Sequence, residues 1–552
     1  MTNWNFADAW ELCAEVRGED KIAFVHGDRR LSWAEVDRRA AGVATALLEA
    51  SLGHQAKVAQ YLYNCPEYLE SVFASFKAAL VPVNVNYRYG DDEVVYLLDN
   101  SDSEAVVFHG AFSELVSRVR HRLPRVRLWL HVDDGSGPAP SFAVPYEVAA
   151  SSLPAGADTS VRGPWGRSPD DLYLLYTGGT TGLPKGVMWR QDDLFAVLNA
   201  GSLIRLPEDK GVEGVRQALM ALDESPPSLL PACPLMHGTG SFTAFLCLSL
   251  GGRIVTLPER HFDARRLLDT IGSERVNLVT IVGDAFARPI VDALDAEPGR
   301  YDLSSLLAIV SSGVMWSEQT KHDLLRHNPN MMLIDVFSSS EAIGMGSSVS
   351  ASGSEAATAS FRLGEDAHIL DDEGNEIPPG SNERGRLAIG GRLPLGYYKD
   401  EAKTAATFVT INGRRFSVPG DFAMVGEDGS IQLLGRGSAV INTGGEKVFP
   451  EEVEEVLKTH PAVADAACVG VPDDRFGEAV CALVELRPGM TADPAELIAH
   501  VETRLARFKA PRYVLFVGSL ARTPSGKLDY KTLQGLGTSS LDELRRQRAA
   551  LA

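Results

Sequence analysis

Strand-like and helix-like segments alternate from the first part of this chain onward, and this alternation limits the folds that it can adopt. The apolar run at 57–63 predicts a strand, 66–80 shows helical spacing with proline in its first turn, and 81–85 predicts another strand. A helix at 92–98 and a strand at 105–108 continue the series. The pattern indicates parallel βαβ units whose helices cover both faces of a sheet.

The alternation continues to about residue 350. Strands are expected at 253–257, 277–282 and 305–310. Asp263 is expected to cap the helix that follows it, because a carboxylate there accepts hydrogen bonds from free backbone N–H groups. The Ala- and Ser-rich stretch 348–360 is expected to be a loop.

From residue 360 the chain changes to short β segments with tight turns, and after Gly435 it changes again. A helix is expected to open at Phe449–Pro450 and to run to Lys458, with proline near its first position and acidic residues in its first turn. The rest of a small α+β unit is expected from strands at 464–471, 480–486 and 513–517 and a helix at 494–505.

These patterns predict an α/β protein of two domains. Residues 1–437 are expected to form a large N-terminal domain, in which βαβ-type sheets pack against helices and a β-rich subdomain covers about 360–437. Residues 438–552 are expected to form a small α+β C-terminal domain. A chain of 552 residues is long enough for both hydrophobic cores.

Charge and composition exclude some classes of protein. The formal net charge of −20 argues against binding to a nucleic-acid backbone, which requires a surplus of lysine and arginine. The proportions of hydrophobic residues, 45%, and of charged residues, 23%, are typical of a soluble globular protein. No apolar run is long enough to span a bilayer, and no signal peptide is evident at the start.

The six cysteines are scattered, without a C-x-x-C pair or the spacing of zinc ligands. We interpret them as reduced core residues, which suits a cytoplasmic location. Neither the H-E-x-x-H motif of zinc enzymes nor the G-x-S-x-G motif of serine hydrolases occurs, so neither class is supported.

The sharpest motif is the stretch YTGGTTGLPKGV at 176–187, which follows a strand-like segment at 172–175. Its glycines let the backbone present N–H groups, its threonines add hydroxyl donors, and Lys185 adds a positive charge, so the loop is expected to bind a polyphosphate. The candidate phosphate-binding residues are Thr177, Gly178, Gly179, Thr180, Thr181 and Lys185. The loop is not a Walker A motif, because Lys185 lies between Pro184 and Gly186.

This stretch resembles the signature YTSGTTGxPKGV of the adenylate-forming superfamily, which includes acyl-CoA synthetases, peptide-synthetase adenylation domains and luciferases. Gly178 stands where serine is usual. The resemblance covers essentially the whole chain in the family's motif order. It implies that ATP, Mg²⁺ and CoA take part, and that Thr177, Lys527 and His237 act in catalysis.

By this resemblance, His237 in the segment PLMHGTG at 234–240 lies at the acyl pocket and gates the carboxylate. Ser312 and Gly313 line the adenine and acyl sites. The segment DVFSSSE at 335–341 matches the family pattern xYGxTE loosely. The resemblance gives its residues the following places: Asp335, Val336, Phe337 and Ser338 at the nucleotide, with Phe337 stacked on adenine, Ser340 near the α-phosphate, and Glu341 as the Mg²⁺ ligand.

The resemblance also assigns residues closer to the C-terminus. Asp421 is expected to accept hydrogen bonds from the ribose hydroxyls, and Arg436 to face the nucleotide. The hinge between the domains is expected near Ser438, where the family usually has aspartate or lysine. Gly445 is expected to line the pantetheine tunnel, and Lys527, in the segment RTPSGK, to be the mobile catalytic lysine.

The implied reaction joins a carboxylate to AMP and then transfers the acyl group to the thiol of CoA. The local sequence around these motifs most resembles that of actinobacterial fatty-acyl synthetases, including those for steroid side chains and other polycyclic terpenoid acids. We therefore expect a large hydrophobic acid as substrate. Two alternatives remain: delivery of the acyl group to a carrier protein, and a catalytically degraded binding protein, for which the loosened FSSSE motif and the missing hinge acid are the only support. A homodimer remains open.

Overall fold

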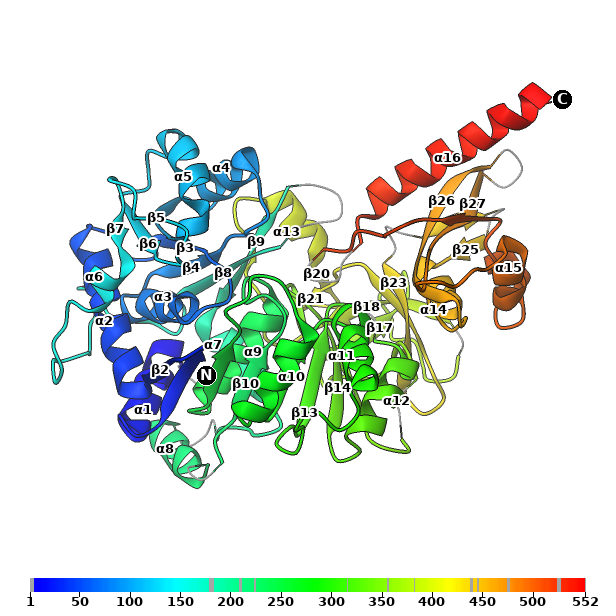
Figure 1. Cartoon of the computed structure of the whole chain (residues 1–552). Helices are drawn as coiled ribbons and strands as arrows, with labels where there is room; N and C mark the ends of the chain where they lie inside the picture. The colour runs from blue at the N-terminus through cyan, green and yellow to red at the C-terminus, as the bar shows by residue number, and fades with distance from the viewer. Residues whose placement is uncertain are drawn as a thin grey trace.

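The computed structural model of this chain describes residues 4–177, 183–207, 211–222, 225–314, 316–354, 357–381, 383–436, 440–443, 446–473, 477–523 and 528–551. Three β-sheets, here called sheets I, II and III, organise these residues (Figure 1). Sheets I and II and their helices form a large N-terminal unit, and sheet III with its helices forms a small C-terminal unit.

Sheet I has the strand order β19-β9-β8-β4-β3-β5-β6-β7, and its central strands β4, β3, β5 and β6 run parallel. Its strands are β3 (Lys57–Tyr61), β4 (Val81–Asn84), β5 (Ser103–His109), β6 (Leu128–Val132), β7 (Val144–Pro145), β8 (Leu172–Thr177), β9 (Lys185–Arg190) and β19 (Gly396–Tyr397). The helices along this part of the chain are α3 (Pro66–Lys77), α4 (Asp91–Asn100), α5 (Ser113–Val119) and α6 (Tyr146–Ala150), with short 3₁₀ turns at Gly110–Phe112 and Arg120–Arg122. Because β19 comes from far along the chain, it ties the β-rich part to this sheet.

Sheet II begins as a parallel sheet in the order β2-β1-β11-β10-β12-β13-β14, apart from the antiparallel edge strand β2. These strands are β1 (Ile22–His26), β2 (Arg29–Ser32), β10 (Ser228–Pro231), β11 (Arg253–Thr256), β12 (Leu278–Ile281), β13 (Ala308–Ser312) and β14 (Met332–Ser339). The helices along this part of the chain are α1 (Phe6–Arg17), α2 (Trp33–Glu49), α7 (Gln191–Ala200), α8 (Gly211–Ala221), α9 (Gly238–Ser249), α10 (Ala264–Ser273), α11 (Asp284–Ala296) and α12 (Glu318–His327). Leucines and isoleucines of α10 to α12 pack on β12 and β13.

The same sheet continues as antiparallel strands, which build the β-rich part of the large unit. They are β15 (Ala342–Ser350), β16 (Ser360–Leu363), β17 (Ala367–Leu370), β18 (Arg384–Ile389), β20 (Phe408–Ile411), β21 (Arg414–Ser417), β22 (Asp421–Val425) and β23 (Ser430–Arg436), with the helix α13 (Glu401–Thr407). The turn at Asp371–Asn375 is closed by a backbone hydrogen bond of 2.9 Å from Asp371 N to Asn375 O, as its sequence of aspartate, glycine and asparagine predicts.

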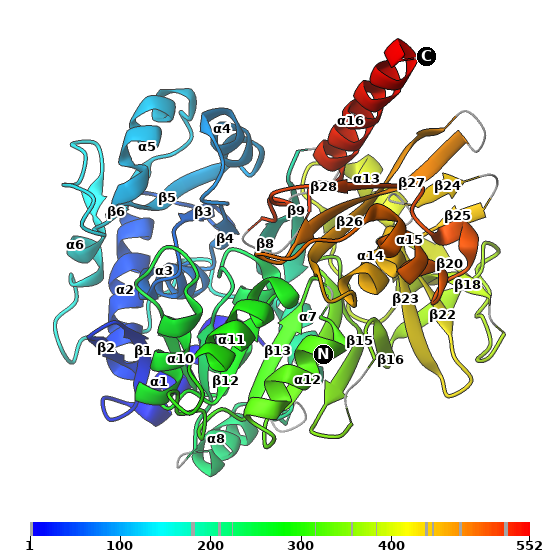
Figure 2. The same ribbon diagram turned by 45° about the vertical axis from the view of Figure 1, so that its right-hand side comes forward.

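The small unit is built on sheet III, in the order β25-β24-β27-β26 with β28 beside β27. Its elements are β24 (Ile441–Thr443), β25 (Glu446–Val448), α14 (Pro450–Lys458), β26 (Val463–Asp473), β27 (Gly477–Leu486), α15 (Pro494–Glu502), a 3₁₀ turn (Arg507–Lys509), β28 (Tyr513–Phe516) and α16 (Tyr530–Leu551). α14 lies beside β23 in both views (Figures 1 and 2), and the rings of Phe422 and Phe449 are 6.1 Å apart at this junction.

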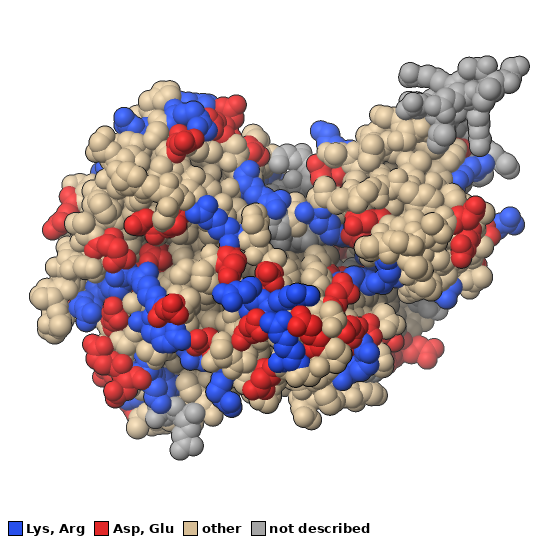
Figure 3. Space-filling view, viewed as in Figure 1, with Lys and Arg blue, Asp and Glu red and all other residues tan. Residues whose placement is uncertain are grey.

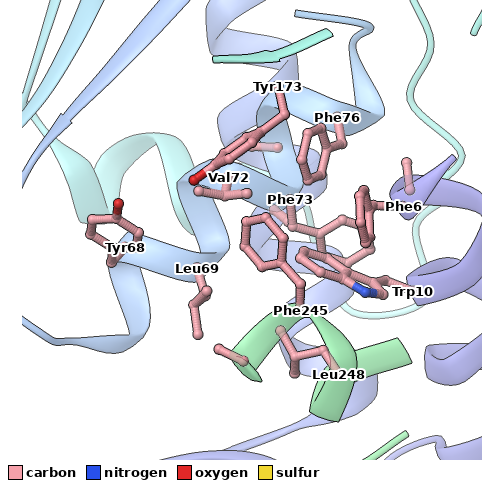
Figure 4. Packing of buried hydrophobic residues seen from close by; sticks show 14 of the residues in the cluster. Phe6, Trp10, Tyr68, Leu69, Val72, Phe73, Phe76, Tyr173, Phe245 and Leu248 are labelled. Atoms are coloured by element: carbon pink, nitrogen blue, oxygen red, sulfur yellow. The ribbon is translucent and has the colours of Figure 1, made fainter. Parts of the chain in front are cut away.

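The largest core joins helices that are far apart in the sequence (Figure 4). The ring of Phe245 in α9 lies 5.3 Å from that of Phe6 and 5.5 Å from that of Trp10, both in α1. Trp10 in turn lies 5.4 Å from Phe73 of α3. Burial of each such side chain contributes roughly 1.5–3 kcal/mol. The helix α9, which begins after its N-cap residue His237, is therefore anchored in this core.

Most of the predicted elements are confirmed, with boundaries that shift by a few residues. Asp263 caps α10, because its Oδ1 accepts hydrogen bonds of 2.9 Å and 3.2 Å from the backbone N–H groups of Arg265 and Arg266. One expectation is wrong in part: the predicted loop at 348–360 begins three residues after its expected start, because β15 extends through Ser350 and pairs there with Leu333 of β14. The predicted boundary near 437 lies outside the described residues.

Acidic and basic side chains are interspersed over the face of the molecule seen in Figure 3. A notch on this face separates the lobe built on sheet I from the small unit. Within the described ranges, no helix is both long enough and apolar enough to cross a membrane.

Candidate active site

The glycine- and threonine-rich loop closes a hairpin between β8 and β9. Thr177, the last residue of β8, pairs in the ladder with Lys185, the first residue of β9, so these two residues form the base of the loop. The ammonium of Lys185 forms an ion pair with Asp400. Four of the predicted phosphate-binding residues lie outside the described ranges, namely Gly178, Gly179, Thr180 and Thr181.

Asn84 fixes the strand that leads into this loop. Its side-chain Nδ2 donates hydrogen bonds of 2.9 Å to Tyr176 O and 2.7 Å to Met236 O, and its Oδ1 accepts one of 2.6 Å from Tyr176 N. The buried amide thereby joins the end of β8 to the residue immediately before His237. An amide suits this place because it can donate and accept at once.

His237 begins α9 as its N-cap residue, with the extended backbone typical of that position. The segment before it is fixed by Asn64, whose Nδ2 donates 3.0 Å to Cys233 O and whose Oδ1 accepts 2.7 Å from Leu235 N. The imidazole is half-buried at the carboxyl end of the sheet, where the sequence places the gate for the carboxylate.

Ser312 is the last residue of β13, Gly313 follows it, and Ser312 contacts the first turn of α9. Thr239 Oγ1 donates a hydrogen bond of 3.5 Å to Ser312 O. Gly313 has a φ of +94°, which a residue with a side chain rarely adopts. Because β13 and β14 are parallel neighbours, Ser312 also lies opposite Val336, so both strand ends and the start of α9 converge at one edge of sheet II. Ligands of α/β proteins bind at such carboxyl edges.

Asp335 lies below this edge as a buried carboxylate. Its Oδ2 is 3.4 Å from Nζ of Lys321, a buried residue of α12. Burial raises the pKa of Asp335 to about 6; Lys321 acts in the opposite direction, whereas Asp284 and Glu455 raise the pKa further. The pair links the predicted nucleotide segment to α12, so Lys321 helps to fix the strand that carries Phe337.

Phe337 and Ser338 lie near the end of β14. The ring of Phe337 lies 5.6 Å from that of Phe361, at an interplanar angle of 36°. Ser338 Oγ accepts a hydrogen bond of 3.0 Å from Gly344 N, across the hairpin that β14 forms with β15. Phe337 is half-buried, so its packing on Phe361 leaves part of the side chain accessible.

Ser340 and Glu341 form the turn of this hairpin, since Ser339 pairs with Ala342. Two contacts from sheet I fix the turn. Trp189 Nε1 donates a hydrogen bond of 2.9 Å to Ser340 O, and the Tyr397 hydroxyl donates one of 2.7 Å to Glu341 Oε1. Glu341 therefore offers an oriented, half-buried carboxylate, a fitting ligand for a hard cation that bridges phosphate oxygens.

The remaining predicted site residues lie toward the small unit. Asp421 is the first residue of β22, is buried, and pairs in the ladder with Arg436, the last residue of β23. Ser438, Gly445 and Lys527 fall outside the described residues, as does the predicted hinge. Their roles therefore stay predictions.

The structure adds residues that sequence patterns missed: Asn84, Lys321, Tyr397 and Asp400. Asn84 had a usable signal, because a polar residue at the carboxyl end of an apolar parallel strand lies at the edge where ligands bind. No sequence signal pointed to Lys321, Tyr397 or Asp400, since each contacts a partner that is distant in the sequence. The contacts of these residues join the loop hairpin, the His237 segment and the Glu341 turn into one site.

Comparison with known proteins places this site in context. The sequence profile described as AMP-binding enzyme matches residues 10–398, and the profile of the AMP-binding enzyme C-terminal domain matches residues 452–527. A medium/long-chain-fatty-acid–CoA/3-oxocholest-4-en-26-oate–CoA ligase of Mycobacterium tuberculosis is 42% identical over 514 residues, covering 93% of this chain and 92% of that protein. A 3-oxocholest-4-en-26-oate–CoA ligase of Rhodococcus rhodochrous is 40% identical over 535 residues, covering 96% and 95%.

Solved structures show the same fold. The crystal structure of an anthranilate CoA ligase in complex with anthranoyl-AMP superposes with a TM-score of 0.83 at 22% identity, covering 98% of this chain and 99% of that one. ATP-bound MatB from Rhodopseudomonas palustris gives a TM-score of 0.77 at 23% identity, covering 97% and 99%. The predicted α/β architecture, with a large N-terminal and a small C-terminal domain, is confirmed.

Proposed function

This chain belongs to the family of AMP-binding enzymes and is an AMP-forming acyl-CoA synthetase, and we propose that its acid substrate is a large hydrophobic carboxylic acid. The class of acid includes medium- and long-chain fatty acids and steroid-side-chain acids. Identities of 40–42% over more than nine tenths of the chain with ligases named for such acids carry the proposal.

The first half-reaction joins the acid to AMP. A carboxylate oxygen attacks the α-phosphorus of ATP, and the bond from that phosphorus to the bridging oxygen breaks, so that pyrophosphate leaves. The half-buried His237, placed before α9, would admit and orient the carboxylate. The Thr177–Gly186 loop would surround the β- and γ-phosphates with backbone and hydroxyl donors, which stabilise the charge that develops on the leaving group.

Further groups complete the nucleotide site in this proposal. Phe337 would stack on adenine, Ser312, Gly313, Asp335 and Val336 would line that pocket, and Asp421 and Arg436 would hold the ribose and the phosphate. Glu341 would hold Mg²⁺, which neutralises charge on the phosphate oxygens when bound. Lys527 would donate to the oxygens between the acyl group and the phosphate as the acyl-adenylate forms.

In the second half-reaction the thiol sulfur of CoA attacks the acyl carbon and AMP leaves. We place the domain boundary at 437–438, with a hinge near Ser438, so that rotation of the small domain withdraws Lys527 and brings Gly445 toward the pantetheine arm. Such a rotation lets one site perform two steps with different electrostatic demands.

Exchange of labelled pyrophosphate into ATP, measured over a panel of carboxylic acids, tests the proposal. Long-chain fatty and steroid-side-chain acids should support exchange, whereas acetate and amino acids should not. Addition of CoA should then release AMP and form the thioester. Lys527→Ala should reduce exchange by a factor of about 100 or more. If no acid supports exchange, or if only a carrier protein accepts the acyl group, the proposed function is wrong.

We propose a cytoplasmic location, because ATP and CoA are the co-substrates and all six cysteines are buried and free. Light scattering of the purified chain tests whether the enzyme is a homodimer.

A further inference from the structure

Lys185 lies at the base of the phosphate loop, yet its ammonium is already paired. The partner is Asp400 Oδ2, a residue 215 positions further along the chain. The second oxygen of Asp400, Oδ1, accepts a hydrogen bond of 2.9 Å from the backbone N–H of Lys403 and so caps α13. The lysine's hydrogen bond is the largest influence holding the pKa of Asp400 below its usual range, so this carboxylate is ionised at neutral pH.

The backbone keeps Asp400 beside the loop. Tyr397 pairs with Val187 in the ladder between β19 and β9, and Tyr398 N donates a hydrogen bond of 2.8 Å to Gly186 O. Asp400 follows this paired segment by two residues and begins a helix, so its position is set on both sides. The carboxylate therefore cannot move away from β9 without breaking the β19 ladder or the helix cap.

The location of this fixed negative charge matters for a polyanionic substrate. If Lys185 left Asp400 to bind a phosphate, an uncompensated carboxylate would remain next to the triphosphate, and like charges at short range repel. If Lys185 stays on Asp400, the repulsion is cancelled and the loop base is tied to α13. In this proposal the phosphates are bound by donors of the loop other than Lys185.

We propose that Lys185 is a positioning residue, which acts on ATP through its ion pair with Asp400 rather than as a phosphate ligand. The inference rests on the proposed function, because the loop is taken as the phosphate site. It also predicts that the pair contributes little to global stability, since the side chains of Lys185 and Asp400 are 38% and 27% exposed.

A double-mutant cycle separates the two roles. The variants are Lys185→Gln, Asp400→Asn and the double variant of the full chain, and the measurement is the Kd of Mg·ATP by calorimetry without acid or CoA. Asparagine retains a side-chain oxygen that can cap α13, so Asp400→Asn removes the charge alone. We expect Asp400→Asn to weaken ATP binding by about fivefold and Lys185→Gln to weaken it by about tenfold, because the second change also leaves the Asp400 charge uncompensated. The double variant should weaken binding by about the same factor as Asp400→Asn alone, rather than by the product of the two.

A direct lysine–phosphate contact gives the opposite pattern. Removal of the Asp400 charge would then tighten ATP binding, and Lys185→Gln would weaken it by at least the same factor when Asp400 is already Asn; either result overturns the proposal. Steady-state kinetics add a second criterion. A positioning role raises the KM for ATP and leaves kcat within about twofold of wild type, whereas a phosphate ligand that acts in the transition state lowers kcat.

Matched controls keep these outcomes distinct from unfolding and from a wrong function. The exposed pair of Arg118 with Asp91, 2.9 Å apart in the α4–α5 region, receives the same changes, Arg118→Gln and Asp91→Asn, and should leave the Kd of Mg·ATP unchanged. Melting temperatures of all variants should stay close to wild type. Absence of acid-dependent exchange in the wild type would refute the proposed function, while the ATP-binding cycle would still test the role of Lys185.

Discussion

The hydroxyl of Tyr397 donates a hydrogen bond of 2.7 Å to Oε1 of Glu341 and thereby connects sheet I to the hairpin turn of sheet II. The ring of Tyr397 is held independently, 5.9 Å from that of Phe408. The hydroxyl can therefore be removed without loss of the packing that places the ring. The contact fixes one carboxylate oxygen in the orientation from which the other can bind a cation.

Tyr397→Phe should raise the Mg²⁺ concentration needed for half-maximal ATP binding by about fivefold. The reason is that a hydrogen bond to a charged group at a half-exposed site contributes about 1 kcal/mol, which corresponds to this factor. Calorimetric ATP titrations at a series of Mg²⁺ concentrations measure this shift. Tyr398→Phe is the matched control, since the neighbouring hydroxyl donates 2.8 Å to Asp102, away from the Glu341 turn. An equal shift in both variants would contradict the role of Tyr397.

Arg39 of α2 is the centre of a buried ion-pair network and should be required for stability. Its guanidinium donates to Glu70 of α3 at 2.8 Å and to Glu147 of α6 at 2.8 Å. Arg39→Met leaves the fully buried Glu70 carboxylate without its cation, which should lower the free energy of unfolding by about 3–5 kcal/mol. Urea unfolding checks the value. Arg122→Met, which removes an exposed pair with Asp92, should have little effect, and comparable losses in both variants would refute the assignment.

The sequence predicts the parallel strands, the caps and the order of motifs well, because these depend on local patterns. Asp263 as an N-cap and Pro450 at the start of α14 are examples of local chemistry that the structure confirms. Ser350 shows where such patterns fail: serine has low strand propensity, but the ladder to Leu333 extends β15 through it.

The contacts that assemble the site cannot be predicted from local sequence patterns, because they join residues that are far apart in the chain. Lys185 and Asp400 lie 215 positions apart, and Tyr397 lies 56 positions from Glu341. No local periodicity encodes such a pair; β19 brings both Tyr397 and Asp400 to β9 only when sheet I forms. Sequence motifs therefore predict which groups face the substrates, whereas the groups that hold those residues in place come from tertiary pairing.

His109 should make the protein sensitive to mild acid. Burial lowers the pKa of His109 to about 4, and its Nδ1 accepts a hydrogen bond of 3.0 Å from Tyr63 N, which requires the neutral ring. In the unfolded chain the pKa returns to about 6.5, so the unfolded state takes up the proton first as the pH falls. The stability contributed by neutral His109 is therefore fully present above pH 6.5 and is lost as the pH falls toward 4.

The size of this effect can be measured with His109→Asn, which keeps an acceptor near the position of Nδ1 but does not titrate. Between pH 7 and pH 5 the wild type should lose about 2 kcal/mol more unfolding free energy than the variant. Urea unfolding at both pH values gives the comparison, and His261→Asn at an exposed histidine serves as the control. Parallel pH dependence of wild type and His109→Asn would show that His109 is not the cause.

Asn84 should be required for activity out of proportion to its effect on stability. Its amide holds Tyr176 at the end of β8 and Met236 beside His237, through three hydrogen bonds of 2.6–2.9 Å. Asn84→Asp keeps the shape but removes both N–H donors and sets a carboxylate against two carbonyl oxygens, which should lower the unfolding free energy by about 1–3 kcal/mol. Because the loop strand and the His237 segment then separate, acid-dependent exchange should fall by about tenfold or more in protein that is still folded.

Asn199 is the matched control, because its buried side-chain amide also hydrogen-bonds to backbone groups but lies away from the site. This buried residue of α7 donates 3.0 Å to Leu206 O and accepts 2.8 Å from Leu206 N, so Asn199→Asp makes the same isosteric change in a similar clamp. It should cost comparable stability and leave exchange per folded molecule near wild type. The two variants, compared at a temperature where both are folded, separate the loss of a buried hydrogen bond from the loss of alignment between the phosphate loop and His237. Equal activity in both would mean that Asn84 only stabilises the fold.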